Sequence, residues 1–97
     1  MNRVDTISKL KAHADTLRAM GATALYLFGS VARNDPEAKD LDLFIEYDPR
    51  QPFSLIELTG LKQYLESELK TDVDLATRDS LHPMLRDEIE QSAIRVF

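Results

Sequence analysis

The sequence contains no cysteine and no tryptophan, and only three glycines and four prolines among 97 residues. The lack of cysteine excludes a disulfide framework, and no apolar run approaches the roughly 18 residues that a membrane-spanning helix needs. Residues 1–6 lack the basic region and the continuous apolar core of a secretory signal. At this length we expect one domain over residues 1–97, acting in the cytoplasm with no membrane partner.

Basic residues are fewer than acidic ones: the chain has 12 Lys and Arg and 17 Asp and Glu, which gives a net charge of −5. The imbalance is concentrated in residues 40–74, which contain nine acids and three bases. A protein that grips a nucleic acid backbone needs a positive surface to displace counterions. The composition therefore predicts no direct contact with nucleic acid and disfavours a template-using polymerase. The acidic segment suits a metal ion or a basic partner.

The stretch from Leu25 to Ile45 is the most informative part of the chain, and it indicates a strand, a turn and a second strand. The first apolar run, predicted as a strand over 23–28, is too short for a helix and stops at Gly29, which allows close approach of the backbone to a ligand. Residues 30–33 can then form one helical turn whose free N–H groups point toward the Gly29–Ser30 corner. We expect an anion such as phosphate to be held there.

Arg33 closes this short turn and allows two interpretations. Its guanidinium suits phosphate oxygens, which would make it a ligand of the bound anion. It also lies close in sequence to Asp35 and Glu37, and an ion pair with either acid explains it equally well. Both interpretations stay open at the level of the sequence.

Asp40 and Asp42 begin the second predicted strand, which covers residues 40–47. Because side chains alternate along a strand, the two carboxylates share one face while Leu41 and Leu43 face the core. Mg²⁺ takes one or two carboxylates plus phosphate oxygens. Carboxylates that follow an anion-binding turn therefore suit a magnesium-bound polyphosphate.

Asp74 adds a third carboxylate from a strand predicted over residues 71–76. The helix predicted over 54–69 is long enough to act as a parallel crossover, which sets the start of this strand beside the start of the strand at 40–47. Asp74 is then expected to join Asp40 and Asp42. Asp72 is earlier in the chain, and we interpret it as a loop residue near the site.

The remaining pattern completes a chain of the α/β (α+β) class, with a small mixed sheet of three to four strands and helices packed on it. One amphipathic helix is predicted over 2–20 with Gly21 as its stop, and a capping box of Ser54 and Glu57 starts the next helix. A helix is expected from Pro83 and an edge strand over 93–97. The side chains expected to face solvent are His13, Tyr64 and, unless it caps its helix, His82.

The pattern Gly29-Ser30-x-x-Arg33 followed by Asp40-x-Asp42 resembles the nucleotidyltransferase superfamily that includes DNA polymerase beta. With the later segments Val73-Asp-Leu-Ala-Thr-Arg-Asp-Ser-Leu, Arg86-Asp-Glu-Ile-Glu and Ile94-Arg-Val-Phe, the chain is similar to minimal nucleotidyltransferases of the MNT type. The resemblance covers nearly the whole chain and implies the polymerase beta-like fold.

The resemblance also implies an activity and a partner. Members of this family act as antitoxins that transfer AMP from ATP to a tyrosine of a helical HEPN ribonuclease toxin, so we expect such a toxin to be encoded nearby. Asp40, Asp42 and Asp74 would be the catalytic and metal-binding residues for two Mg²⁺ ions, with Asp74 helping to deprotonate the acceptor. The nucleotide phosphates would be held by Gly29, Ser30 and Arg33.

Three features depart from the usual pattern: the loop after Gly29 is one residue shorter, Lys39 replaces a serine, and Asn34 stands where glycine is common. Asn enters left-handed conformations more readily than most residues, and all three carboxylates remain, which favours an active enzyme.

Other interpretations stay open. The chain could neutralise its partner by contact alone, or it could be a small-molecule nucleotidyltransferase of the aminoglycoside-modifying kind, although 97 residues leave no room for a drug-binding domain. The plainest alternative is a hairpin with two solvated aspartates. Self-association is also open.

Overall fold

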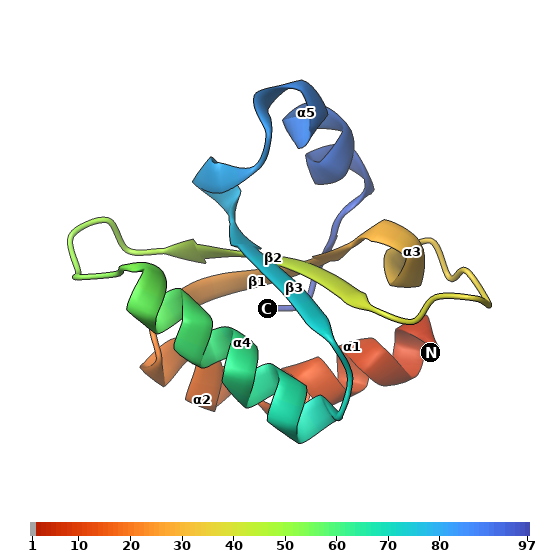
Figure 1. Cartoon of the computed structure of the whole chain (residues 1–97), viewed down its shortest axis with the longest axis horizontal. Helices are drawn as coiled ribbons and strands as arrows, with labels where there is room; N and C mark the ends of the chain where they lie inside the picture. The colour runs from red at the N-terminus through yellow and green to blue at the C-terminus, as the bar shows by residue number, and fades with distance from the viewer. Residues whose placement is uncertain (1) are drawn as a thin grey trace.

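The computed structural model of the chain describes residues 2–97 and contains one four-stranded sheet with helices on both sides (Figure 1). In sheet order the strands are β3 (Val73–Thr77), β2 (Leu41–Tyr47), β1 (Ala22–Phe28) and β4 (Ile94–Arg95). The helices are α1 (Arg3–Ala12), α2 (Ala14–Ala19), α3 (Gly29–Ala32), α4 (Leu55–Leu69), the 3₁₀ helix η1 (Arg78–Ser80) and α5 (Pro83–Ser92).

The sheet is mixed, as the sequence predicts. Strand β1 pairs antiparallel with both β2 and β4, and β2 pairs in parallel with β3. The parallel pair is possible because α4 forms the crossover between its two strands. The predicted α/β class and the fourth, C-terminal strand are therefore confirmed, although β4 has only two residues.

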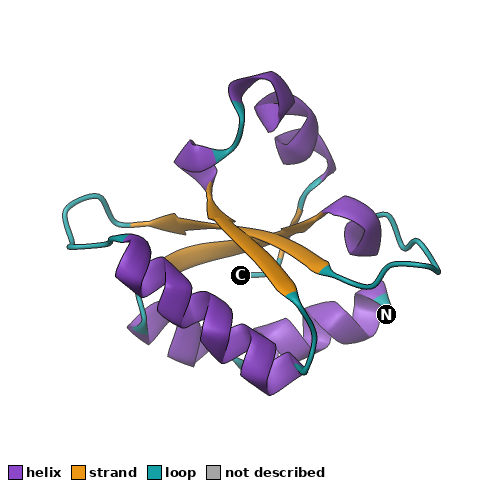
Figure 2. Ribbon diagram, in the orientation of Figure 1, coloured by secondary structure: helices purple, strands orange, loops and turns teal. Residues whose placement is uncertain are grey.

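One face of the sheet is covered by α1, α2 and α4 (Figures 1 and 2). From β2, the side chains of Leu41, Leu43 and Ile45 point into this layer and are almost fully buried. Their partners in the same cluster include Leu10, Leu17, Leu61 and Leu65 from the three helices. Since residues alternate along a strand, the opposite face of β2 carries Asp42, Phe44 and Glu46.

Helix α4 begins and packs as its sequence predicts. The Ser54 N–H donates to Glu57 Oε2 at 2.8 Å, and the Ser54 hydroxyl oxygen accepts from Ile56 N at 3.2 Å, so that a capping box closes the first turn. Leu61 and Leu65 are buried against the sheet. This docking fixes the crossover that carries the chain from β2 to β3.

The predicted N-terminal helix over 2–20 is wrong as a single element, because it is interrupted at His13 between α1 and α2. The prediction that His13 and Tyr64 face solvent is also wrong: His13 Nδ1 lies 2.8 Å from the Tyr64 hydroxyl, and both side chains are half-buried. This contact joins residues 51 positions apart, so no periodic pattern within either helix could reveal it.

Smaller differences concern the ends of elements. Strand β2 begins at Leu41 and β3 at Val73, which leaves Asp40 and Asp72 just outside the strands. Two expected caps are confirmed: Gly21, with φ +113°, follows the end of α2, and His82 Nδ1 accepts from Met84 N at 3.2 Å at the start of α5. Of the helices within residues 2–97, none combines the length and apolar character that crossing a bilayer requires.

Candidate active site

Gly29 connects the end of β1 to α3 in a conformation that favours glycine. Its φ is +74°, and a Cβ built there would lie 2.2 Å from Asp42 Oδ2. Any side chain at Gly29 would therefore collide with the Asp42 carboxylate, in addition to the strain of a positive φ. The turn and the carboxylate are packed directly against each other, which brings together two of the residue types predicted for the site.

The segment after α3 folds back through local hydrogen bonds. Asn34 has a left-handed φ of 58°, as expected for an Asn where glycine is common. The Asp35 N–H donates to Ser30 O at 3.0 Å, and the Asp35 carboxylate accepts from Glu37 N at 2.9 Å. Asp35 is thus used within the loop. Among residues 2–97, Arg33 has no carboxylate within ion-pair distance, which weakens the alternative that it pairs with Asp35 or Glu37.

The parallel register of β2 and β3 brings two of the carboxylate-bearing residues side by side. Asp42 is the Cα partner of Asp74, and the Leu41 N–H donates to Asp72 O at 3.1 Å at the beginning of the pair. Asp40 immediately precedes this point on an exposed bend. The three carboxylates therefore gather at one edge of the sheet, on the face that α1, α2 and α4 do not cover.

The surroundings of Asp42 favour the protonated form of its carboxyl group. Its pKa is raised above the ordinary value mainly by burial, then by the negative charges of Asp74 and Asp40, while Arg33 opposes the shift. Asp40 and Asp74 are exposed, whereas Asp42 is half-buried against Gly29. The excess negative charge at Asp42 would be relieved by a cation at this point.

These residues fit a magnesium ion that arrives with a nucleotide better than a free ion. In residues 2–97, no group of three or more His, Cys, Asp or Glu side chains is arranged to hold a metal by itself. Mg²⁺ completes its coordination with substrate phosphates and needs only one or two carboxylates. The space that a side chain at Gly29 would fill is taken by the Asp42 carboxylate, so a metal ion held by Asp42 would lie beside the backbone of the turn.

Comparison with known proteins decides the family. The model of the nucleotidyltransferase domain family matches residues 7–96. The chain belongs to this family. A proposed protein adenylyltransferase of Methanocaldococcus jannaschii is 39% identical over 78 residues, which are 79% of this chain and 82% of that protein.

Solved structures agree with the fold of this nucleotidyltransferase. A proposed minimal nucleotidyltransferase superposes with a TM-score of 0.80 at 30% identity, and the match covers 97% of this chain and 95% of the other. A complex from Shewanella oneidensis, described as a tri-AMPylated HEPN toxin with an MNT antitoxin, has a TM-score of 0.66 at 23% identity. That match covers 90% of this chain and 68% of the other and shows the fold alone.

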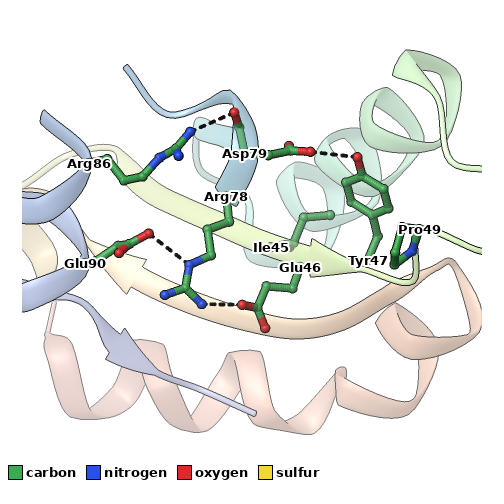
Figure 3. A pocket seen from close by; sticks show the side chains of 8 residues that line it. All are labelled: Ile45, Glu46, Tyr47, Pro49, Arg78, Asp79, Arg86 and Glu90. Carbon is green, nitrogen blue, oxygen red and sulfur yellow. Dashed lines mark hydrogen bonds and ion pairs between the residues drawn. The ribbon is translucent and has the colours of Figure 1, made fainter. Parts of the chain in front are cut away.

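A second polar cluster of the nucleotidyltransferase, which the sequence did not indicate, lies toward the far end of β2. It lines a pocket of about 330 Å³ between β2, η1 and α5 (Figure 3). Arg78 lies between Glu46 of β2 and Glu90 of α5 and pairs with both, with 2.9 Å from its Nε to Glu90 Oε1. These two acids raise the pKa of Arg78. The Tyr47 hydroxyl donates to Asp79 Oδ2 at 2.9 Å.

The charges in this pocket are satisfied mostly by one another, so we interpret the cluster as the attachment of α5 to the sheet. Arg86 of α5 extends the attachment, since its Nη2 donates to Asp79 O at 2.9 Å. A weak signal was present in the sequence, because Glu46 has the same strand parity as Asp42 and therefore shares the face on which α5 lies. Its partner Arg78 is 32 positions away, which no local pattern indicates.

Proposed function

We propose that this nucleotidyltransferase transfers AMP from ATP to a hydroxyl of a partner protein, and that it acts as the antitoxin of a HEPN toxin whose modified residue is a tyrosine. The observation that carries the proposal is the placement of Asp42 against the Gly29 turn and beside Asp74. The Asp42 carboxylate lies directly against the backbone of the turn to which we assign the phosphates.

The reaction assigns a role to each residue. The acceptor oxygen forms a bond to the α-phosphorus of ATP, the bond from that phosphorus to the bridging oxygen of the β-phosphate breaks, and pyrophosphate leaves. Asp74, exposed at the start of β3, takes the proton of the acceptor hydroxyl. Asp40, Asp42 and Asp74 would hold two Mg²⁺ ions, which when bound supply positive charge to the attacking and leaving oxygens.

The phosphates are assigned to the turn at the end of β1. Gly29 presents its backbone at the point where Asp42 approaches, and Ser30 follows it in α3. The exposed guanidinium of Arg33 acts to lower the pKa of Asp42. Arg33 therefore suits a phosphate bound between the turn and the carboxylates. Residues 1–97 would serve as one minimal catalytic domain in the cytoplasm, with the acceptor surface provided by the partner.

The descriptions of two similar proteins support this assignment. The protein of Methanocaldococcus jannaschii is named for adenylyl transfer to protein, and the complex from Shewanella oneidensis contains an AMPylated HEPN toxin beside an MNT antitoxin. We also expect no activity on nucleic acid, given the net charge of −5.

The proposal is tested by incubating the chain with Mg²⁺, ATP labelled at the α-phosphate, and the purified product of the adjacent gene. We expect stable label on a tyrosine of that protein, and none with the Asp40→Ala plus Asp42→Ala variant. Asp5→Ala plus Asp15→Ala is the matched control, because it removes two exposed carboxylates from α1 and α2. Label that persists in the Asp40 and Asp42 variant contradicts the assigned site. Tight binding without label favours neutralisation by contact.

A further inference from the structure

Helix α5 is exposed to an unusual degree for an amphipathic element. None of its residues, Pro83–Ser92, is fully buried. Met84 is 86% exposed and Leu85 is 50% exposed, so two consecutive large apolar side chains reach solvent from the first turn of the same short helix. Single exposed apolar residues need no explanation, but a pair on one helix is a candidate contact surface.

Polar contacts join α5 to η1 and β2 (Figure 3). Glu90 pairs with Arg78, and Arg86 donates to the main-chain oxygens of Asp79 and Leu81 at 2.9 and 3.4 Å. These contacts use the side of the helix that faces η1 and β2. Met84 and Leu85 take no part in these polar contacts, and their exposed surfaces are available for another molecule.

The location of α5 relates these two side chains to the proposed reaction. The helix lies on the side of the sheet opposite α1, α2 and α4 (Figure 1), and it contacts α3, the turn assigned to the phosphates. An acceptor hydroxyl has to reach a phosphate at this turn from the same side, because the other face of the sheet is covered. A protein that presents such a hydroxyl would meet α5.

We propose that Met84 and Leu85 form the centre of the surface on which the acceptor protein docks. The identity of that protein rests on the proposed function. The neighbouring side chains Asp87 and Glu88 are exposed acids, and the whole chain carries a charge of −5. The complementary surface is therefore an apolar hollow with basic side chains around it. Methionine suits the contact because its unbranched side chain adapts to irregular surfaces.

A helix of ten residues does not supply a whole interface, since a stable complex buries about 800 Å² on each partner. The remainder would come from α3, which contacts α5, and from the carboxylates that lie beyond it. Docking on α5 would in this way hold the acceptor hydroxyl next to the nucleotide. The surface would contribute to recognition, and the carboxylates to the reaction itself.

A second exposed apolar pair provides a matched control. Leu55 and Ile56 at the start of α4 are 75% and 82% exposed and line a hollow of about 470 Å³. Helix α4 lies on the covered side of the sheet (Figure 1). A protein bound there would not reach Asp42 and Asp74, so this pair matches the α5 pair in chemistry but not in location.

The experiment compares Met84→Ser plus Leu85→Ser with Leu55→Ser plus Ile56→Ser in the full chain. Calorimetry measures the Kd for the purified product of the adjacent gene and, separately, for Mg²⁺ with ATP, and circular dichroism checks the fold. We expect the α5 variant to weaken binding of the protein by about tenfold or more, as for central interface residues, with a raised KM for the protein and unchanged affinity for Mg²⁺ with ATP. The α4 variant should match the native chain in all three.

A charge-reversal variant tests the polarity of the partner surface. Asp87→Lys plus Glu88→Lys should slow association and remove part of its dependence on salt. An α4 variant that loses binding while the α5 variant keeps it overturns the inference, and so does equal binding by all variants. If the native chain labels the protein while the α5 variant binds normally, transfer stands and docking fails. Binding without label that is weakened only in the α5 variant sustains docking while the proposed transfer fails.

Discussion

The two faces of β2 show how one strand serves both folding and the site. Leu41, Leu43 and Ile45 are buried under three helices on one face. On the other face, Asp42 and Glu46 are half-buried beside Phe44 and have charged neighbours. Apolar burial on the covered face stabilises the folded chain. The opposite face instead concentrates negative charge, which has to be neutralised by a ligand or an arginine.

The two ends of β2 also differ in how the acids on its uncovered face are neutralised. At the far end, Glu46 is neutralised within the chain by Arg78. At the near end, Asp42 lies near two further aspartates, and within residues 2–97 the positive charge that opposes them is that of the exposed Arg33. A charge that the protein leaves uncompensated marks the end at which a ligand is expected.

The largest expected effect on stability belongs to the covered face. Leu43→Ala should lower the free energy of unfolding by about 2–5 kcal/mol, because it leaves a cavity at a fully buried position. Urea unfolding measures the change. Val4→Ala, at a position 70% exposed, is the control and should change stability by about 0.5 kcal/mol or less. Equal effects of the two variants would contradict the assignment of the core.

The next effect concerns activity and the opposite face. Asp74→Asn should reduce AMP transfer by about 100-fold or more, a loss typical of removing one group that stabilises the reacting charges, with little change in folding. Asp72→Asn removes the same charge two positions earlier, outside β3, and should retain most of the activity. Initial rates of labelling measure both variants. A larger loss in Asp72→Asn would mean that the parallel register does not select the reacting carboxylate.

Gly29→Ala should cost about 1–2 kcal/mol from its positive φ, with a further loss from the collision with Asp42 Oδ2. Gly60→Ala in α4 is the matched control, because a Cβ there has as its nearest atom Met20 Cε at 4.0 Å. In a helix interior this change should stabilise the chain by about 0.5–1 kcal/mol. Thermal unfolding should therefore shift in opposite directions, and parallel shifts would argue against a tight turn at Gly29.

The smallest expected effect is on the stability of the ligand-free protein and comes from the charge of Asp42. Because the pKa of Asp42 is raised in the folded state, the folded chain binds more protons than the unfolded chain above the ordinary value of 3.8, and stability falls as pH rises through that window. Asp42→Asn should be the more stable protein at neutral pH, by no more than about 1 kcal/mol for a partly exposed group.

Urea unfolding of both proteins at a series of pH values checks this sign. The difference between native and Asp42→Asn should shrink as the pH is lowered through the raised pKa of Asp42. Lower stability of the variant at neutral pH would show instead that Asp42 has a structural role.

Local patterns were sufficient for the framework of the site. The Ser54 and Glu57 capping box, the length of α4 and the alternation in β2 and β3 together predict the parallel pair, and the Asp42 and Asp74 partnership is seen in the structure. The left-handed Asn34 was predictable from residue type. Each of these depends on spacing within one or two elements.

Contacts between distant side chains were not predictable. The side chain of His13, where the first helix is interrupted, is hydrogen-bonded to Tyr64. Arg78 attaches α5 by pairing with Glu46 and Glu90. Each of these contacts joins two separate elements, so its partners can be identified only once the packing of those elements is known. A half-buried tyrosine among charged residues has the same local pattern as an exposed one.

The strand order also has a kinetic consequence. The Gly29 turn and Asp42 belong to an antiparallel pair whose strands are joined by a short segment, whereas Asp74 reaches Asp42 only after α4 has crossed the sheet. Closing a longer loop costs more chain entropy, and distant contacts form later in folding. We therefore expect the phosphate turn and its first carboxylate to be assembled early, and the full set of carboxylates only when α4 docks.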